Sequence, residues 1–422
     1  MVKFIHAADL HLDSPLLGLD RYEGAPVDEV RLATREALKR LVAFAIEEKV
    51  DFVVIAGDIY DGNWKDYNTG LFFVDCMRQL ADAKIRVFLI TGNHDAQNKM
   101  SRSLRLPDRV VQFDTRKPET IRLEDLGVSI HGFSFAEAEV AKNVALDFPA
   151  ADRGMLNIGL LHTSLDSESQ SGHKRYAPCS LDDLRSRGYE YWGLGHIHMR
   201  AIHCEDPWIV YPGNLQGRHI RETGAKGCVL VEAEGNRITQ CKFIPLDVMR
   251  WELVSLDGKQ LEDAESLYTL AKQEFAAAYA RQERMPLAIR LVVEGACKAH
   301  SALARRWNDH QAELKAIATS ASSGQVWLEK ILLQTSEPLE EQNAPIADGA
   351  IAELSLLVHE LADIDAGTEQ VLDLLRELQR KLPGELAERE DGLDLANPHF
   401  GRRLLAGAHE LLKDHLQRGG TP

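Results

Sequence analysis

Short apolar runs alternate with segments of helical periodicity through the first 250 residues. The apolar runs have the length of buried strands and cover Val2–His6, Phe52–Ala56, Val87–Thr91, Val128–Gly132, Leu156–Leu161 and Tyr191–Leu194. Apolar residues at helical spacing lie between the early runs, at about 27–49 and 67–83. This alternation favours a largely parallel sheet covered by helices. Later runs, near 201–212, 226–234 and 237–245, have no long helix between them, as is typical of antiparallel strands. We therefore expect an α/β fold in which a β-sandwich is flanked by helices.

The pattern changes near residue 250. Strand-like runs at Trp251–Leu256, Leu287–Val293 and Val326–Gln334 are separated by helical stretches at about 260–283 and 299–318. This order predicts a small α/β domain over residues 251–335, after a first domain over residues 1–250. Residues 336–347 are acidic, contain two prolines and are typical of a linker. The remainder, 348–422, has apolar residues at helical spacing and predicts C-terminal helices.

Five short polar motifs stand in the first domain, and four of them directly follow an apolar run. They read Asp9-Leu10-His11, Gly57-Asp58-Ile59-Tyr60-Asp61, Gly92-Asn93-His94-Asp95, Leu161-His162-Thr163 and Gly195-His196-Ile197-His198. Carboxylates, an amide oxygen and imidazoles together form a ligand set for divalent metals. Two metals a few ångströms apart can support in-line attack of water on a phosphate ester. We regard each motif alone as a weak signal, but the ordered set after strands as specific.

The spacing within the motifs suggests a balanced division of the ligands. Residues i and i+2 of an extended chain point to the same side, so the pairs Asp9/His11 and His196/His198 can each converge. We expect one metal to be held by Asp9, His11 and His198, and the other by Asn93, His162 and His196, with Asp58 shared.

His94 is left over from this division, because it cannot easily point at the same ion as its neighbour Asn93. We expect it to face the substrate and to protonate the departing oxygen or stabilise charge on the phosphate. Asp95 is expected to orient the His94 ring, and Asp61 to support a metal ligand.

Composition and charge limit the binding partners and cellular locations that we expect for the protein. The net charge is −16, and residues 251–422 hold −11 of it, with 29 acidic and 18 basic side chains. Nucleic-acid binding would therefore need a local basic face. The six cysteines are scattered, no apolar run approaches about 18 residues, and the N-terminus lacks a long apolar stretch. We expect a cytoplasmic protein with no membrane partner.

The motif order resembles the calcineurin-like metallophosphoesterase superfamily. More narrowly, the first 250 residues resemble the SbcD-type nuclease subunits of double-strand-break repair, and within them the YhaO-like branch. The closer match is carried by the stretches His6–Pro15, Tyr191–His198 and Tyr211–Arg218. The remainder is similar only in layout, as a small capping domain followed by helices.

The resemblance implies two manganese ions and cleavage of phosphodiester bonds in DNA, as an exonuclease or endonuclease on single strands or ends. It carries metal ligation onto Asp9, His11, Asp58, Asn93, His162, His196 and His198, and catalysis onto His94. Some family members have a histidine three residues after the bridging aspartate, whereas this chain has Asp61. A role of that position in processing DNA ends is therefore in doubt here.

Two features of the sequence can each be interpreted in two ways. The arginines that follow the motifs, namely Arg102, Arg105, Arg200, Arg218 and Arg221, are either phosphate contacts or ordinary solvated side chains. The C-terminal helices either pack on their own domain or, as the resemblance implies, grip the coiled coil of an SbcC-like ATPase in a homodimeric complex.

Three functions are consistent with the sequence. The first is a two-metal DNA nuclease of an SbcD-like repair complex, nucleoid-associated when bound to DNA. The second is a phosphodiesterase or phosphatase for nucleotides or other small phosphoesters. The third is a scaffold whose main task is to bind an ATPase, and the intact ligand set argues against it.

Overall fold

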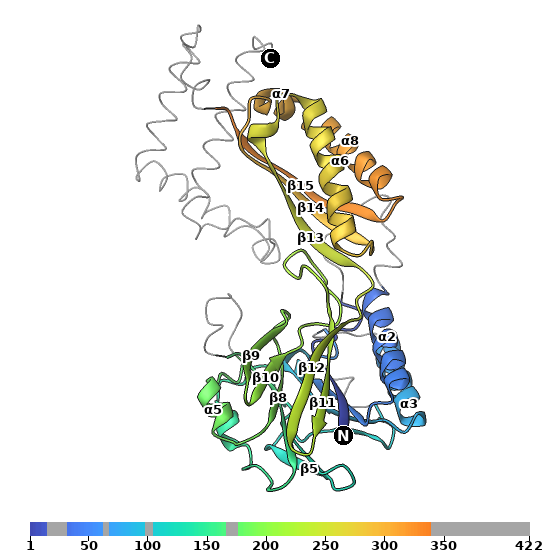
Figure 1. Ribbon diagram of the computed structural model, residues 1–422, viewed down its shortest axis with the longest axis vertical. Coiled ribbons are helices and arrows are strands. Elements are labelled where there is room, and N and C mark those ends of the chain that lie inside the picture. Colours follow the sequence, from blue (N-terminus) through green and yellow to red (C-terminus); the bar gives the residue numbers. More distant parts are fainter. Residues whose placement is uncertain (15–31, 62–66, 98–103, 166–175, 339–422) are drawn as a thin grey trace. The chain divides into compact units, whose positions relative to one another are not determined.

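The computed structural model describes residues 1–14, 32–61, 67–97, 104–165 and 176–338, and Figure 1 shows the arrangement of its strands and helices. Residues Met1–Glu337 form one compact unit. Within these described ranges no helix combines the length and apolar character needed to cross a membrane.

Two six-stranded sheets carry the first 250 residues. The first has the order β12-β11-β1-β2-β3-β4, with β1 (Val2–Ala7), β2 (Phe52–Ala56), β3 (Arg86–Ile90), β4 (Val110–Gln112), β11 (Gly227–Glu234) and β12 (Arg237–Pro245). The second has the order β5-β6-β7-β8-β10-β9, with β5 (Glu119–Leu123), β6 (Val128–Gly132), β7 (Leu156–His162), β8 (Tyr191–Gly195), β9 (Ala201–Glu205) and β10 (Trp208–Tyr211). The sequence-adjacent pairs β1–β2, β2–β3, β6–β7 and β7–β8 are parallel.

The two sheets pack face to face, and strand β2 shows how. Phe52, Val54 and Ala56 belong to an apolar cluster that also includes residues of the second sheet, such as Ile158. Val53 and Ile55 point the other way, into a cluster with α2 (Ala33–Glu48) and α3 (Tyr67–Asp82). Because β2 is buried on both faces, its sequence is a continuous apolar run without alternation.

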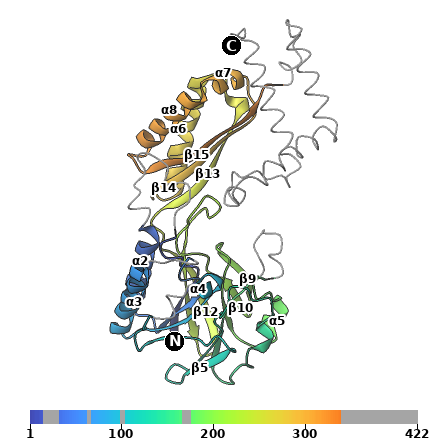
Figure 2. The ribbon, with the colours of Figure 1, turned by 180° about the vertical axis from the view of Figure 1, so that it is seen from behind.

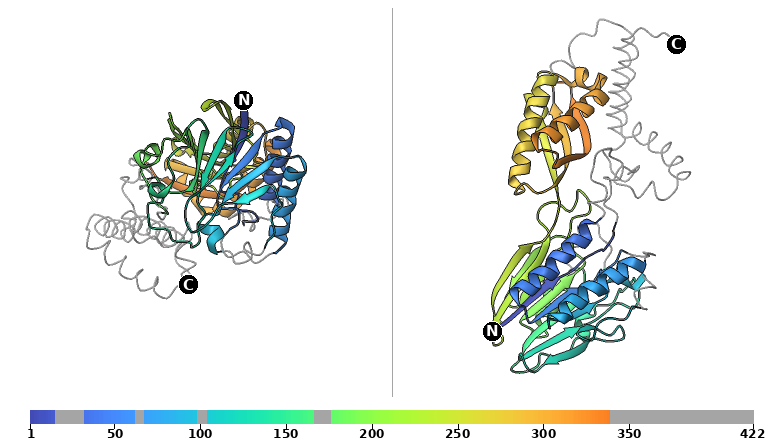
Figure 3. Two further views of the ribbon diagram at one scale, coloured as in Figure 1. Left: turned by 90° about the horizontal axis from the view of Figure 1, so that it is seen from below. Right: turned by 90° about the vertical axis from the view of Figure 1, so that its right-hand side faces the viewer.

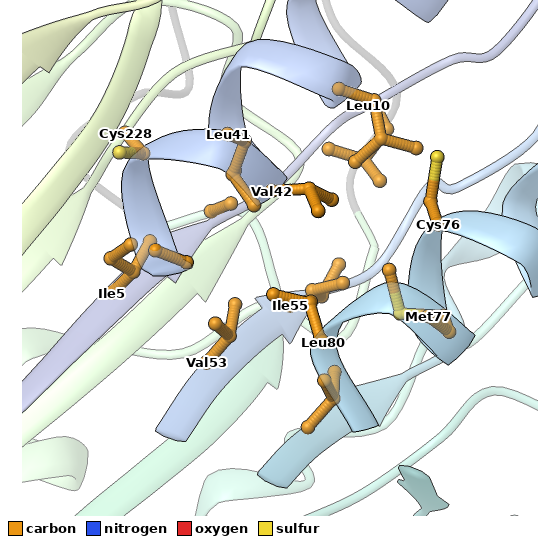
Figure 4. Close-up of a cluster of buried hydrophobic side chains, with 14 of the residues drawn as sticks. Ile5, Leu10, Leu41, Val42, Val53, Ile55, Cys76, Met77, Leu80 and Cys228 are labelled. Carbon is orange, nitrogen blue, oxygen red and sulfur yellow. The ribbon is translucent and has the colours of Figure 1, made fainter. Parts of the chain in front are cut away.

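Helices α2 and α3 cover the outer face of the first sheet, and Figure 3 shows them side by side in blue. Figure 4 shows the packing, in which Leu41 and Val42 of α2 and Met77 of α3 lie over Val53 and Ile55 of β2. A third cluster, including Trp192, covers the outer face of the second sheet, together with the short segments η2 (Ala145–Asp147) and α5 (Leu181–Arg185).

A separate three-stranded parallel sheet follows, in the order β13-β14-β15. It consists of β13 (Arg250–Asp257), β14 (Leu287–Ala296) and β15 (Val326–Ser336), connected through η4 (Gly258–Gln260), α6 (Ala264–Arg281), α7 (His300–Arg305) and α8 (Trp307–Ala321). Helices α6 and α8 pack side by side on this sheet (Figure 2). The predicted β-α-β-α-β order is present here.

The predicted α/β class and sandwich are confirmed, with two local corrections. The single helix expected over 299–318 is two helices, because Arg306 leaves helical geometry with φ −125° and ψ 32°. The run near 201–212 forms two strands, and β10 pairs with β8 in parallel as well as with β9 in antiparallel register. Of the helix expected over about 27–49, the described part begins at Ala33. The linker predicted over 336–347 starts inside a strand, because Ser336 is the last residue of β15. Its residues from 339 on, and the predicted C-terminal helices, lie outside the described residues.

This topology positions the polar motifs. Strands β1, β2 and β3 run parallel, and so do β7 and β8, so their carboxyl ends lie at one edge of each sheet. Each of the five motifs contains one of these ends or begins within two residues of it.

Close contact between the two sheets at this edge depends on Gly195. A Cβ atom there would overlap the carbonyl oxygen of Ala56 at the end of β2, and a backbone atom of a central strand cannot move aside. We predict that Gly195→Ala lowers the free energy of unfolding by about 3 kcal/mol, measured by urea denaturation.

Gly235→Ala is the control, because Gly235 lies in the β11–β12 turn with no atom within 4 Å of a new Cβ and with φ +58°. It should cost only left-handed backbone strain, about 1 kcal/mol. An equal loss in the two variants would contradict the close-contact explanation.

Candidate metal centre

The predicted ligands come from the carboxyl ends of five strands in two facing sheets. Asp9 and His11 follow β1, Asp58 follows β2 and Asn93 follows β3. His162 ends β7, and His196 and His198 follow β8. Asp9, His11, Asp58, Asn93, His162 and His196 are buried, and His198 is partly exposed.

The backbone of this edge is strained at the ligands themselves. Asp9, His11, Asp58 and His196 all have positive φ, of 51°, 40°, 50° and 99°. Such conformations cost about 1–3 kcal/mol each for residues other than glycine, and they persist only where the surroundings enforce them. Here the β1–β2 pairing continues past the strands, with Asp9 N donating to Gly57 O and His11 N to Asp58 O, both at 3.0 Å.

Asp58 lies between two groups of ligands. Its Oδ2 is 3.4 Å from His162 Nε2 and 3.7 Å from His11 Nε2. Its Oδ1 accepts the backbone amide of His94 at 3.0 Å, which fixes the carboxylate and leaves Oδ2 directed at both imidazoles. This is the position expected for a carboxylate shared by two metals.

Two of the histidines have their tautomers set by neighbours. His162 Nδ1 donates to Ala56 O at 3.0 Å, and His198 Nδ1 donates to Glu222 Oε1 at 2.7 Å. In the neutral form of each ring, the lone pair that a metal needs is therefore on Nε2. His198 Nε2 lies 3.1 Å from His11 Nε2, so two imidazole nitrogens converge on one point.

Among the described residues, potential ligand atoms gather in three groups. One group consists of His11, Asp61 and His94, and the other two match the predicted division in part. Asp9, His11 and His198 have ligand atoms within 4.8 Å of one another, and so do Asp9, Asp58 and His162. Asp9 thus contacts both groups, as well as accepting the backbone amide of His196 at 3.0 and 3.1 Å.

Asn93 and His196 lie beside His162. Asn93 Oδ1 is 3.0 Å from His162 Nε2, and the His196 and His162 rings have centroids 5.3 Å apart. The three residues predicted for the second metal are therefore neighbours.

His94 stands at the open side of the centre, with its side chain 38% exposed. The carboxylate that contacts it is Asp61, whose Oδ1 lies 3.2 Å from His94 Nδ1 and 3.5 Å from His11 Nδ1. The expectation that Asp95 orients the ring is corrected. Asp95 accepts the backbone amides of Tyr60 and Gly92 at 2.9 and 3.0 Å and so ties the β2 and β3 loops together.

Several carboxylates are buried together at the centre, and this shifts the pKa values of the groups there. Burial, with the facing Asp58 charge, raises the pKa of Asp9. Burial alone would lower the pKa of His162, but the Asp58 carboxylate raises it to about 9. Burial also opposes ionisation of Asp61, yet hydrogen bonds with His11 and His94 hold its pKa below the usual range. A metal ion must displace the His162 proton at neutral pH, so metal binding should release protons.

The predicted arginines differ in placement. Arg218 is nearly buried at the centre, with Nη2 3.1 Å from Glu222 Oε1 and Nη1 3.4 Å from Ser14 Oγ. Arg105, Arg200 and Arg221 are exposed, and the Arg200 guanidinium lies 5.0 Å from the Phe243 ring centroid. Arg102 lies outside the described residues.

Sequence reasoning missed Glu222 and the role of Ser14. Glu222 is buried and contacts His198, while Ser14 Oγ donates to Asp61 Oδ2 at 2.8 Å. The one signal for Glu222 was an acidic residue within a basic stretch, next to Arg221.

The donor set fits two divalent cations. Among the described residues, four carboxylates lie at the centre, with the cations of Arg218 and Lys226 beside them; the carboxylates are those of Asp9, Asp58, Asp61 and Glu222. Buried carboxylates in such excess need compensating positive charge. Lone pairs fixed on His162 and His198, with a carboxylate between the groups, are the oxygen and nitrogen ligands that such ions use.

Comparisons with known proteins agree with this geometry. Residues 2–200 match the calcineurin-like phosphoesterase family, and residues 251–336 match the middle domain of metallophosphoesterase YhaO. The chain is 33% identical over 296 residues to metallophosphoesterase YhaO of Bacillus subtilis, covering 69% of this chain and 71% of that protein.

Two nuclease-related proteins are similar at lower identity. One subunit of the nuclease SbcCD of Staphylococcus epidermidis is 23% identical over 284 residues, covering 61% of this chain and 72% of that protein. DNA double-strand break repair protein Mre11 of Aeropyrum pernix is 29% identical over 249 residues, covering 54% and 57%.

The shared position of Asp58 leads to a prediction about metal stoichiometry. Asp58→Asn keeps the shape of the side chain but removes the charge between the two groups, so at least one of two bound metals should be lost. Elemental analysis after gel filtration measures this. Asp125→Asn, which removes an exposed carboxylate paired with Arg86, is the control and should retain both metals. Full occupancy in Asp58→Asn would rule out the shared role.

Proposed function

We propose that this chain, which belongs to the calcineurin-like phosphoesterase family, is a two-metal nuclease that hydrolyses phosphodiester bonds in DNA. Family membership supports phosphoester hydrolysis at a dimetal centre. The observation that carries the proposal is Asp58 Oδ2 facing both His162 and His11, with His94 beside it at the open side.

Two divalent ions bound at this centre would polarise the phosphate and lower the pKa of an attacking water. Side chains of this protein would hold both ions. Asp9, His11 and His198 are proposed to hold one ion, and Asn93, His162 and His196 the other. Asp58 is shared between them. Manganese is our proposal for the metal.

His94 is proposed as the catalytic residue. Asp61 fixes its Nδ1, so Nε2 is available to the substrate. Burial would lower the pKa of His94, but the hydrogen bond to Asp61 and the nearby Asp58 charge raise it. A protonated imidazole at the open side can donate to the departing oxygen, or to a charged phosphate oxygen in the transition state.

DNA is proposed as the substrate for two reasons. Similar proteins carry the names of a nuclease subunit and a DNA repair protein. The exposed Arg200 lies two residues after His198 and the exposed Arg221 is next to Glu222, so both can contact flanking phosphates. By the same similarity we propose an SbcC-like ATPase as partner, a homodimeric assembly, and activity on single strands or ends.

We predict that His94→Asn lowers the turnover number on single-stranded DNA by about 10²–10⁴-fold, because the proton donor is lost. Metal content should stay at the wild-type value, because His94 is not among the proposed ligands. Rate assays together with elemental analysis test this.

His300→Asn is the matched control, since His300 contacts Thr335 in the three-stranded domain, and its rate should be unchanged. Wild-type cleavage by His94→Asn would remove His94 from the mechanism.

The substrate is tested with wild-type protein and the double variant Arg200→Ala/Arg221→Ala. We expect efficient cleavage of single-stranded DNA and weak hydrolysis of nucleotides. The double variant should raise KM for DNA and weaken its salt dependence, while hydrolysis of a small chromogenic diester stays unchanged.

Arg78→Ala/Arg116→Ala, which removes two exposed arginines paired with nearby aspartates, controls for loss of surface charge. A preference of the wild-type protein for nucleotides over DNA would support a small-molecule phosphoesterase instead.

A further inference from the structure

Glu222 is a buried carboxylate in the loop between β10 and β11, and only 4% of its side chain is exposed. It belongs to none of the five motifs. A buried carboxylate is costly unless hydrogen-bonded or paired, so its partners indicate what holds it there.

Both oxygens of Glu222 are engaged at the metal centre. Oε1 accepts from His198 Nδ1 at 2.7 Å and lies 3.1 Å from Arg218 Nη2. Oε2 accepts the backbone amide of Arg218 at 2.7 Å and Asn214 Nδ2 at 2.8 Å. One carboxylate therefore connects a predicted metal ligand to Asn214 and Arg218 in the loop between β10 and β11.

We infer that Glu222 is a positioning residue for His198, and through it for one of the two metal sites. This inference rests on the proposed dimetal centre. Accepting the Nδ1 proton fixes the tautomer of His198, places the lone pair on Nε2, and raises the basicity of the ring as a ligand. Nε2 is the atom that lies 3.1 Å from His11 Nε2, at the point where that metal would sit.

A purely structural role, as the counter-charge of Arg218, does not account for this geometry. Arg218 Nη2 lies 3.1 Å from Oε1, whereas the shorter 2.7 Å contact of the same oxygen is with His198. The backbone of His198 is held separately, because Lys226 Nζ donates to its carbonyl oxygen at 2.8 Å. Arg218 Nη2 also lies 3.1 Å from His198 Nδ1, but a guanidinium has no acceptor atom, so the Nδ1 proton is accepted by Glu222 Oε1 at 2.7 Å. Glu222 therefore sets the tautomer of the ring.

The effect of Glu222 should be confined to one metal site. His162 has its Nδ1 fixed by Ala56 O, and Asn93 contacts His162 directly. Neither arrangement involves Glu222. Removing its charge should therefore weaken the site of Asp9, His11 and His198 and leave the site of Asn93, His162 and His196 intact.

The test compares wild-type protein with Glu222→Gln by calorimetric titration with Mn²⁺. The amide keeps the side-chain volume but places a donor group among the donors of Arg218 and Asn214. We expect one site to lose about 10–100-fold in affinity while the other stays at the wild-type value. At intermediate Mn²⁺, electron paramagnetic resonance should show isolated ions in the variant and a coupled pair in the wild type.

Two further variants keep the outcome decisive. Glu222→Asp retains the charge and should restore part of the lost affinity. Glu329→Gln removes a buried carboxylate that pairs with Arg290 in the three-stranded domain at 2.7 Å, and it should leave both sites unchanged while losing stability. Wild-type affinity at both sites of Glu222→Gln, or equal loss at both, would overturn the positioning role. Absence of any bound Mn²⁺ in the wild type would instead refute the proposed dimetal centre.

Discussion

Burial of the Asp9 and Asp58 carboxylates within one small volume is the constraint on which the centre depends. Each is about 1% exposed, and ligand atoms of both lie within 4.8 Å of one another and of His162. Like charges at that separation in a low-dielectric interior repel strongly and must be compensated. Backbone amides of His94 and His196 supply part of the compensation. Divalent cations supply far more, so the geometry is suited to a metal-loaded state.

The sandwich holds these residues on backbone that stays paired beyond the strand ends. Strand pairing between β1 and β2 continues through Asp9 and His11, and the same residues adopt positive φ. Local strain is therefore held in place by two core strands and by apolar layers on both sides of them. A ligand set preorganised in this way binds its ions with little rearrangement.

Much of this could be predicted from sequence, because the strongest signals were local. Strand β2 is apolar throughout since both of its faces are buried, and Asp58 follows it after one glycine. Parallel strands bring their carboxyl ends together, so motifs far apart in sequence could be grouped from their positions after the apolar runs alone. The half-exposed β5 and the three-residue β4 carry no such pattern and were missed.

Other features depend on side-chain direction, which spacing does not determine. Asp95 is next to His94 in sequence and Asp61 is far from it. Only the structure shows that Asp61 is the carboxylate that contacts the His94 ring. Glu222 reaches His198 across 24 residues of chain, with no motif to connect them. Contacts of this kind can only be identified once the side chains are placed in space.

Anomalous X-ray diffraction from crystals grown with Mn²⁺ tests the dimetal centre most directly. Two peaks are expected, roughly 3.5–4 Å apart, on either side of the Asp58 carboxylate. One should lie by His11 and His198, and the other by Asn93 and His162. A single peak, or peaks that do not contact Asp58, would contradict a centre built around that shared carboxylate.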